Sequence, residues 1–430
     1  MNVIRYEHVN ETVYHEKLDN GLDVYVLPKK GFHKTFATFS TKYGSIDNHF
    51  QVEGKQEVQV PDGIAHFLEH KMFEEPTGDI FATFASYGAS ANAFTSFDRT
   101  VYLFSATDHV MESLETLLNF VQNPYFTDEN VEKEKGIIGQ EINMYKDHPD
   151  WRSYFGLIEA MYSAHPVRID IAGTIESISQ ITKEMLYECY HTFYHPTNMS
   201  VFVVGGVDAE EVIDRVRRNQ AAKTFEPQGE IKRIFQPEPD SVHNPQKVTR
   251  LPVSQPKCLF GFKEAHDPIE GQALLEKECA SKLMMDILFS PTSAIYQTLY
   301  DEKLISDNFG ADFNCTPGYT FSVIGGDTRD PELLLERIKQ LVNDELERGI
   351  GEKDFERSRN KKIGGFLRML NSPESIARLY TDYRFKGADA FDMLTIYRNM
   401  SLEEVNTRLH EHFNWEQLAV SIVADPKEAS

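Results

Sequence analysis

Residues 62–73 read Asp-Gly-Ile-Ala-His-Phe-Leu-Glu-His-Lys-Met-Phe, a pattern typical of an amphipathic helix with Asp62 as its N-cap. His66 and His70 are four residues apart, so they lie one turn apart on one face of this helix. Glu69 joins that polar face. The apolar positions are Ile64, Phe67, Leu68 and Met72. The segment therefore predicts a helix that buries one side and presents two imidazoles and a carboxylate on the other.

Two imidazoles at this spacing can converge on one metal ion. A catalytic zinc site uses about three protein ligands and keeps one position for water, and a carboxylate beside that water can take its proton. We therefore expect Zn²⁺ as the cofactor, His66 and His70 as ligands, and Glu69 as the general base. The alternative is a chance HxxEH match on an ordinary helix, and replacement of zinc by another divalent ion stays open.

A second helical segment offers candidates for the third ligand. Acidic residues follow Thr127, an expected N-cap, and the sequence through Tyr145 has helical periodicity. Glu134 and Glu141 share a face but lie seven residues apart, about 10 Å at about 1.5 Å per residue, so they cannot both ligate one ion. One should bind and the other should support it. Among Glu132, Glu134 and Glu141, the helical pattern alone does not choose.

Charge and composition limit the partners. The 430-residue chain has 44 Lys and Arg against 67 Asp and Glu, a formal net charge of −23, which disfavours nucleic acid as a partner. The hydrophobic content of 41% is that of a folded protein. The first residues lack the apolar core of a signal peptide, and the apolar runs are too short to span a bilayer. We expect no membrane contact.

Cysteine spacing indicates a reducing compartment. The four cysteines lie far apart and form no CxxC pair, which disfavours both a disulfide framework and a cysteine zinc site. They are Cys189, Cys258, Cys279 and Cys315. Together with the missing signal core, this predicts a cytoplasmic protein.

The chain mixes strand and helix patterns. An Asp19-Asn20-Gly21 turn between alternating segments predicts a hairpin near the start. Further strands are expected at 35–43, 92–97, 100–106 and 200–206. Between them lie helical periods, so the class is mixed α and β.

The length favours two domains. Prolines and polar residues crowd residues 227–246, a composition that resists helix and sheet pairing. We therefore predict a catalytic zinc-binding domain over 1–226, a linker over 227–246, and a second domain without the zinc motif over 247–430.

A weak internal repeat supports two similar halves. Thr182 opens a helix that leads to a strand at Met199, and Ser401 opens one that leads to Leu418. Both pairs have the same offset, because 401 − 182 and 418 − 199 both equal 219. Duplication is the favoured interpretation, and chance similarity between common helix-strand units is the alternative.

Several segments together resemble a known family. His66-Phe-Leu-Glu69-His70 is the inverted zinc motif of the inverzincins. Its surroundings resemble the family of pitrilysin, insulin-degrading enzyme and mitochondrial processing peptidase, in particular its half-size bacterial members. The matching segments are Leu18-Asp-Asn-Gly-Leu, Gly88-Ala-Ser-Ala-Asn-Ala-Phe-Thr, Asn123-Pro-Tyr-Phe, Ile137-Ile-Gly-Gln-Glu-Ile, His165-Pro, Gly173 and His195-Pro-Thr-Asn-Met. They cover most of the first half of the chain and, more faintly, the second.

The resemblance implies roles and a fold. It matches Glu141 to the third metal ligand and Glu134 to a supporting acid, which leaves His165 and His195 as structural residues. It implies two homologous α+β domains of the mitochondrial-processing-peptidase type, with antiparallel-rich sheets layered with helices. Its members bind extended peptides as an added strand at a sheet edge, and here the matching edge is Asn92, Ala93, Phe94 and Thr95. The expected activity is that of a zinc endopeptidase for short unstructured peptides, such as leader segments.

The sequence departs from the family at one place. Members hold the substrate with an Arg and a Tyr seven residues apart, and the aligned positions here are Tyr300 and Asp307. The second half also has no histidines in the helix over 280–289. A chain with zinc ligands but no Arg/Tyr pair resembles one subunit of the family's heterodimers. We therefore predict a heterodimer in which a homologous sister subunit supplies the pair.

Two alternatives remain. The same fold serves as a non-catalytic scaffold or peptide-binding subunit in some relatives, although the intact His66, Glu69, His70 and Glu141 argue against that role. A zinc hydrolase of small molecules is weaker, because the resemblance extends well beyond the metal motif.

Overall fold

The computed structural model describes residues 1–76, 78–265 and 268–428, which form two compact units. The first unit comprises residues 1–142, 169–235 and 369–385. The second comprises residues 143–168, 236–368 and 386–430. In the described part of the chain, no helix combines the length and the hydropathy needed to cross a membrane.

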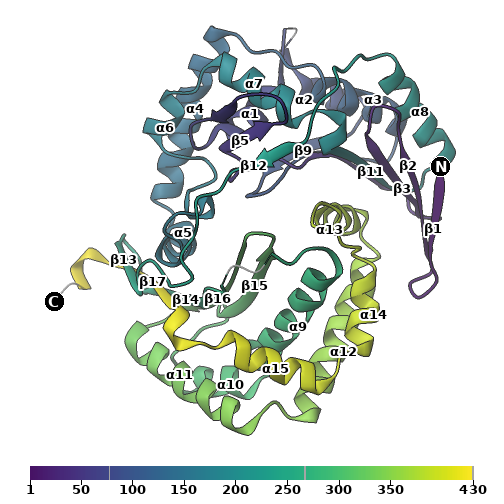
Figure 1. Ribbon diagram of the computed structural model, residues 1–430. Helices are drawn as coiled ribbons and strands as arrows, with labels where there is room; N and C mark the ends of the chain where they lie inside the picture. Colours follow the sequence, from purple (N-terminus) through teal and green to yellow (C-terminus); the bar gives the residue numbers. More distant parts are fainter. Residues whose placement is uncertain (77, 266–267, 429–430) are drawn as a thin grey trace. The chain divides into compact units, whose positions relative to one another are not determined.

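A seven-stranded mixed sheet forms the centre of the first unit (Figure 1). In sheet order its strands are β1 (Asn2–Tyr6), β2 (Glu11–Lys17), β3 (Asp23–Pro28), β11 (Met199–Gly205), β4 (Thr35–Thr41), β10 (Thr100–Ala106) and β9 (Ser90–Thr95). Strand β11 runs parallel to β3, and the other pairs are antiparallel. Strand β9 is at one end of this order. A three-stranded sheet contains β12 (Ile231–Arg233), β5 (His49–Val52) and β6 (Glu57–Gln59). A two-stranded sheet contains β7 (Glu74–Glu75) and β8 (Gly78–Asp79).

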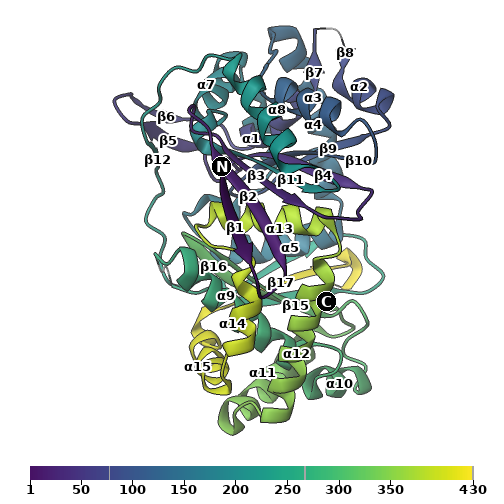
Figure 2. The same cartoon turned by 90° about the vertical axis from the view of Figure 1, so that its right-hand side faces the viewer.

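Helices cover both faces of this sheet, as the burial of its central strands requires. Every residue of β4 and β11 is buried, so these strands lack the alternation of a sheet with one solvated face. Helix α13 packs on β11 and β4 (Figure 2), and α3 and α8 pack on the sheet as well. The helices of this unit are α1 (Ile64–Met72), α2 (Ile80–Ser86), α3 (Val110–Val121), α4 (Asp128–Lys146, ending in the second unit), α6 (Ile175–Ser179), α7 (Lys183–Phe193), α8 (Ala209–Ala221), α13 (Pro373–Phe385) and the short η2 (Pro196–Asn198).

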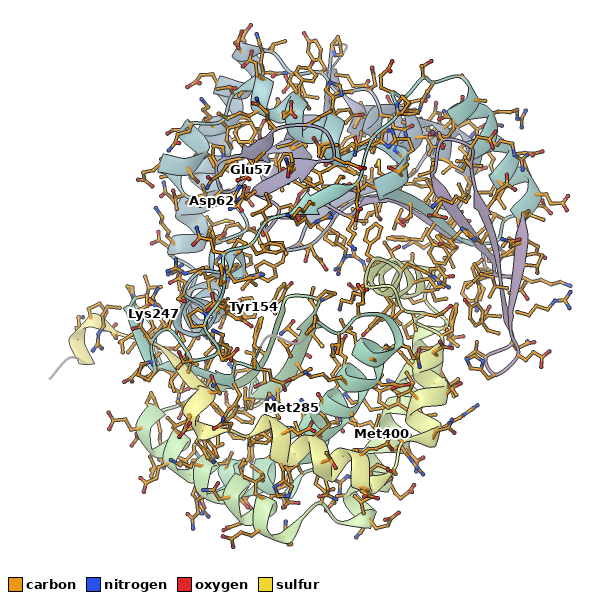
Figure 3. All side chains as sticks on the ribbon, in the orientation of Figure 1. Glu57, Asp62, Tyr154, Lys247, Met285 and Met400 are labelled. Carbon is orange, nitrogen blue, oxygen red and sulfur yellow. The ribbon has the colours of Figure 1, made fainter. Side chains whose placement is uncertain are left out.

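The second unit has a five-stranded sheet in the order β13 (Gln246–Arg250), β17 (Leu418–Ala424), β14 (Lys257–Phe262), β16 (Tyr319–Asp327) and β15 (Gly310–Thr316). Helix α5 packs on β17, β14 and β13, and α9 packs on β15. Lys247 on β13 pairs with Glu159 on α5; Figure 3 labels Lys247 together with Tyr154 on α5 and Met285 on α9. The helices are α5 (Pro149–Met161), α9 (Gly271–Phe289), α10 (Ala294–Asp301), α11 (Pro331–Arg348), α12 (Glu352–Met369), α14 (Asp392–Asn399), α15 (Leu402–His412) and the short η1 (Pro166–Arg168), η3 (Trp415–Gln417) and η4 (Pro426–Glu428).

The two sheets repeat one topology, as the 219-residue offset predicts. Strand β11 lies between a parallel and an antiparallel neighbour, and β17 lies between the same kinds of neighbour. The order β3-β11-β4-β10-β9 therefore corresponds to β13-β17-β14-β16-β15. The prediction of two α+β domains with antiparallel-rich sheets is confirmed.

The compact units differ from the predicted residue ranges because the halves exchange one helix each. Helix α5 lies in the first half of the sequence but belongs to the second unit, and α13 lies in the second half but belongs to the first. Each packs on the central strands of its adopted sheet, α5 on β17 and β14 and α13 on β11 and β4. Local sequence patterns do not reveal such an exchange, because the sheet on which each helix packs depends on residues distant in the sequence.

The predicted strands and hairpin agree with the structure to within two residues, and one expectation is wrong. Strand β10 spans the predicted residues, and Gly21 takes a positive φ of 90° in the turn between β2 and β3. Residues 227–246 were expected to avoid sheet pairing, but β12 pairs with β5. Its three residues lie between the prolines, so they keep their backbone donors.

Candidate metal centre

Helix α1 presents the two motif histidines. It begins at Gly63, whose φ of 89° suits glycine, and a Cβ there would lie 2.4 Å from the Ala172 carbonyl oxygen. Asp62 was expected to cap this helix, but no side chain caps it. Asp62 instead accepts a hydrogen bond from Asn48 at 2.6 Å. The tight crossing of Gly63 past Ala172 therefore fixes the start of the helix.

Helix α4 brings two glutamates to the histidines. It begins after Thr127, whose hydroxyl accepts a hydrogen bond from the Asn130 amide at 3.1 Å, as the sequence predicted. Glu134 reaches Nδ1 of His70 at 3.1 Å, and Glu141 lies 3.6 Å from Nε2 of the same ring. The two glutamates therefore contact opposite sides of one imidazole.

Glu141 also lies 3.7 Å from Nε2 of His66, and the candidate ligand atoms of His66, His70 and Glu141 all lie within 4.8 Å of one another. Distances near 3.6 Å are long for hydrogen bonds. They suit ligands of one ion, because tetrahedral zinc with bonds of about 2.0–2.2 Å separates its ligands by about 3.4 Å. Two imidazole nitrogens and a carboxylate oxygen form a donor set that fits zinc.

The protonation of the two rings follows from their surroundings. Burial, with a smaller effect of the charge on His70, lowers the pKa of His66 to about 3, so this ring is a neutral donor. Burial would also lower the pKa of His70, but the hydrogen bond to Glu134 and the nearby carboxylates raise it. Nδ1–H of His70 donates a hydrogen bond to Glu134, which leaves the lone pair of Nε2 to bind a metal ion.

Glu69 lies on the same helix and is buried, with 8% of its surface exposed. Burial raises the pKa of Glu69, although a hydrogen bond from the Thr95 hydroxyl at 2.7 Å opposes that shift. For Glu134, burial would raise the pKa, but the hydrogen bond from His70 and the charge of Lys71 lower it. The arrangement combines an ionised supporting carboxylate with a second carboxylate suited to proton transfer.

Lys71 is a residue of the site that was not predicted from the sequence. This side chain is fully buried, and its ammonium contacts Glu74 and lies 3.6 Å from the second oxygen of Glu134. One oxygen of Glu134 thus faces His70 and the other faces Lys71. A lysine in an amphipathic helix usually reads as solvated, so only its tertiary contacts reveal this role.

The residues predicted to bind substrate lie on the strand at the end of the sheet order. Asn92, Ala93, Phe94 and Thr95 lie on β9, whose outer edge pairs with no strand among the described residues. Thr95 reaches Glu69, and the guanidinium of Arg378 lies 4.9 Å from the centre of the Phe94 ring.

Glu132, His165 and His195 lie outside the cluster formed by the three candidate metal ligands. The side chain of Glu132 is 75% exposed. The Nδ1 atom of His165 accepts from the Val167 amide, and that of His195 accepts from the Thr197 amide. Both histidines therefore stabilise turns.

Comparison with known proteins identifies the family. Residues 55–175 match the description Insulinase (Peptidase family M16), and residues 180–362 match the Peptidase M16 inactive domain. The zinc protease YmfH of Bacillus subtilis is 54% identical over 418 residues, 97% of each chain. The chain belongs to peptidase family M16.

Solved structures agree with the M16 assignment. An M16-like peptidase from Alicyclobacillus acidocaldarius has a TM-score of 0.94 and 44% identity, with 96% of this chain and 98% of that chain covered. The periplasmic protease PqqL from Escherichia coli shares the fold with a TM-score of 0.74 and 15% identity. The match covers 99% of this M16 chain but 48% of PqqL. The chain therefore spans about half of PqqL and nearly all of the Alicyclobacillus peptidase.

Proposed function

We propose that the chain is a zinc-dependent endopeptidase that hydrolyses short unstructured peptides. The observation that carries the proposal is the convergence of His66, His70 and Glu141 with Glu69 one residue from a ligand on the same helix. The zinc protease names of its relatives support the choice of metal. When bound, zinc polarises the scissile carbonyl and makes its water a better nucleophile near neutral pH.

The side chains divide the remaining work. His66, His70 and Glu141 hold the metal. Glu69 accepts a proton from the attacking water and passes it to the leaving amine. Glu134 fixes the orientation of the His70 ring through its 3.1 Å contact with Nδ1, and Lys71 in turn holds Glu134.

The substrate binds as an added strand on β9. This strand is at the end of the sheet order, and its outer edge offers backbone groups to an extended peptide. Asn92, Ala93, Phe94 and Thr95 would contact that peptide. Recognition through backbone groups suits unfolded segments, including leader or signal-type peptides, rather than folded proteins.

A homologous sister subunit completes the site in this proposal. The chain spans about half of PqqL, and the positions aligned with the Arg/Tyr pair are Tyr300 and Asp307. The sister supplies that pair, and the two subunits act as a heterodimer. The four free and buried cysteines fit the reducing conditions of the cytoplasm.

The test is a peptide-library digest followed by mass spectrometry, with the chain alone and with its sister subunit. Glu69→Gln should abolish cleavage while zinc stays bound, and Glu132→Gln, on the exposed side of α4, should leave cleavage unchanged. Cleavage by the chain alone would overturn the heterodimer. Stoichiometric zinc without cleavage in either mixture would favour a scaffold or peptide-binding subunit.

A further inference from the structure

Thr95 connects the proposed peptide strand to the proposed general base. It is the last residue of β9, and its hydroxyl lies 2.7 Å from Oε2 of Glu69. We propose that Thr95 is a positioning residue that fixes the rotamer of Glu69 for proton transfer, an inference that rests on the proposed function.

The direction of the hydroxyl proton can be assigned. The Thr100 hydroxyl lies 3.3 Å from that of Thr95, but it donates to the Tyr43 carbonyl at 2.9 Å. A hydroxyl has one proton, and an ionised carboxylate only accepts. The shorter contact of Thr95 is the one to Glu69, so its proton goes there and Oε2 is occupied. Oε1 is then the oxygen of Glu69 left to take a proton from water.

Orientation of this oxygen matters for rate, because a general base must meet the proton within hydrogen-bond distance. Helix α1 fixes only the backbone of Glu69, and its side chain has three rotatable bonds. The hydrogen bond from Thr95 restricts them from the neighbouring sheet. Since β9 also carries the peptide in the proposed mode, one strand sets the position of both the substrate and the base.

The second unit shows that the fold does not need this hydroxyl. In the first unit Thr95 pairs with Thr100, which pairs with Thr41. In the second unit the corresponding residues are Phe313, which pairs with Ser322, and Phe262, whose amide donates to the Ser322 hydroxyl. Phenylalanine thus occupies the position of Thr95 in an equally regular strand pair, so a purely structural role for the threonine is not required by the topology.

The experiment compares Thr95→Val, which keeps the shape and removes the donor, with Thr95→Ser, which keeps the donor. In the zinc-loaded protein with its sister subunit, Thr95→Val should lower kcat about 10- to 100-fold with KM within about twofold. Thr95→Ser should stay within about threefold of the parent. Zinc affinity of the metal-free proteins, measured by chelator competition, should be equal in all three. Thr407→Val, at an exposed position of α15, is the matched control.

Three results would overturn the inference. They are an unchanged kcat in Thr95→Val, a serine variant as slow as the valine variant, or a change confined to KM, which would assign Thr95 to peptide binding alone. Should valine disturb folding, Thr95→Ala removes the same donor without adding bulk. In a Glu69→Gln background, loss of the donor should have no further effect on the residual rate. If Glu69→Gln itself is harmless, the proposed function fails; if only the Thr95 variants are harmless, this inference fails alone.

Discussion

Both compact units hold a partly buried cluster of histidine and carboxylate groups, but the balance of charge differs between the two clusters. In the first unit Glu69, Glu134 and Glu141 surround the two histidines, and Lys71 is the ammonium that contacts this group. In the second unit the carboxylate of Glu264 contacts His412, Arg408 and Lys277, at 2.5–2.8 Å. The second cluster therefore satisfies its charge with the chain's own cations.

The pKa values express the same difference. Burial would raise the pKa of Glu264, but His412, Arg408 and Lys277 hold it well below its usual range. His412 bridges Glu264 and the Ser322 hydroxyl, at 2.7 and 2.9 Å. Buried carboxylates in excess of cations are unfavourable unless a positive ion joins them. One cluster is thus a candidate metal site and the other a closed structural network, according to which cations the chain supplies.

The largest expected effect comes from removing a metal ligand. His70→Ala should weaken zinc binding roughly a thousandfold or more, because one of three protein donors is lost. Metal content after dialysis and chelator competition measure it. The matched variant in the second unit is His412→Gln, which should retain one zinc per chain. Loss of zinc in the His412 variant would contradict the contrast between the clusters.

A smaller effect is expected at Glu134. Glu134→Gln should weaken zinc affinity about 10- to 100-fold, because a neutral amide holds the His70 proton less strongly and leaves Lys71 without that carboxylate. The same competition assay reports it. Glu132→Gln on the same helix is the control, since its side chain is 75% exposed. Equal affinities for the two variants would show that the Glu134 contact does not tune the site.

Acid should weaken the second unit through Glu238. Burial would raise the pKa of Glu238, but Lys263 and the amides of Ser163, Ala164 and His165 lower it to about 2. Because the folded pKa lies below the ordinary value of about 4.3, its stabilisation is present above about pH 4.3 and is lost as the pH falls toward about 2.

Glu238→Gln should therefore cost roughly 1–2 kcal/mol at pH 7, reduced by partial solvent screening, and flatten the loss of stability between about pH 4 and 2. Urea unfolding at several pH values measures both. Glu230→Gln, at an exposed position, is the comparison. Identical acid profiles for the parent and Glu238→Gln would refute the assignment.

The smallest effect compares two equivalent helix caps. The Ser401 hydroxyl accepts from the Glu404 amide while Glu404 accepts from the Ser401 amide, a reciprocal pair. Thr182 accepts one bond, from the Met185 amide at 3.4 Å. Ser401→Ala should cost about 1 kcal/mol of unfolding free energy and Thr182→Ala about half as much. Chemical denaturation would detect a reversed order, with Thr407→Ala in the same helix as Ser401 as a control.

Local spacing explains what the sequence could predict. The helix with His66 and His70 follows from a four-residue interval, and β10 follows from its composition, because neither depends on distant residues. The interval between Glu134 and Glu141 predicted that only one of them would bind a metal ion directly. The interval alone did not identify which glutamate is the candidate ligand, because this depends on which nitrogen of the His70 ring each glutamate faces.

Non-local packing explains the rest. The burial of Lys71 beside Glu134, the hydrogen bond from Thr95 to Glu69 and the close approach of Gly63 to Ala172 all join segments far apart in the sequence. The exchange of α5 and α13 is the extreme case, because both helices look ordinary where they stand in the chain.

This exchange also sets an order of events during synthesis. The last proposed metal ligand, Glu141, leaves the ribosome long before α13, which ends at Phe385. Until then the face of β4 and β11 that α13 covers is exposed, so the nascent first unit has its histidines and glutamates but not its complete core. A gene split in the region 227–246 would separate each sheet from its exchanged helix. The first unit can therefore finish folding only after α13 has been translated.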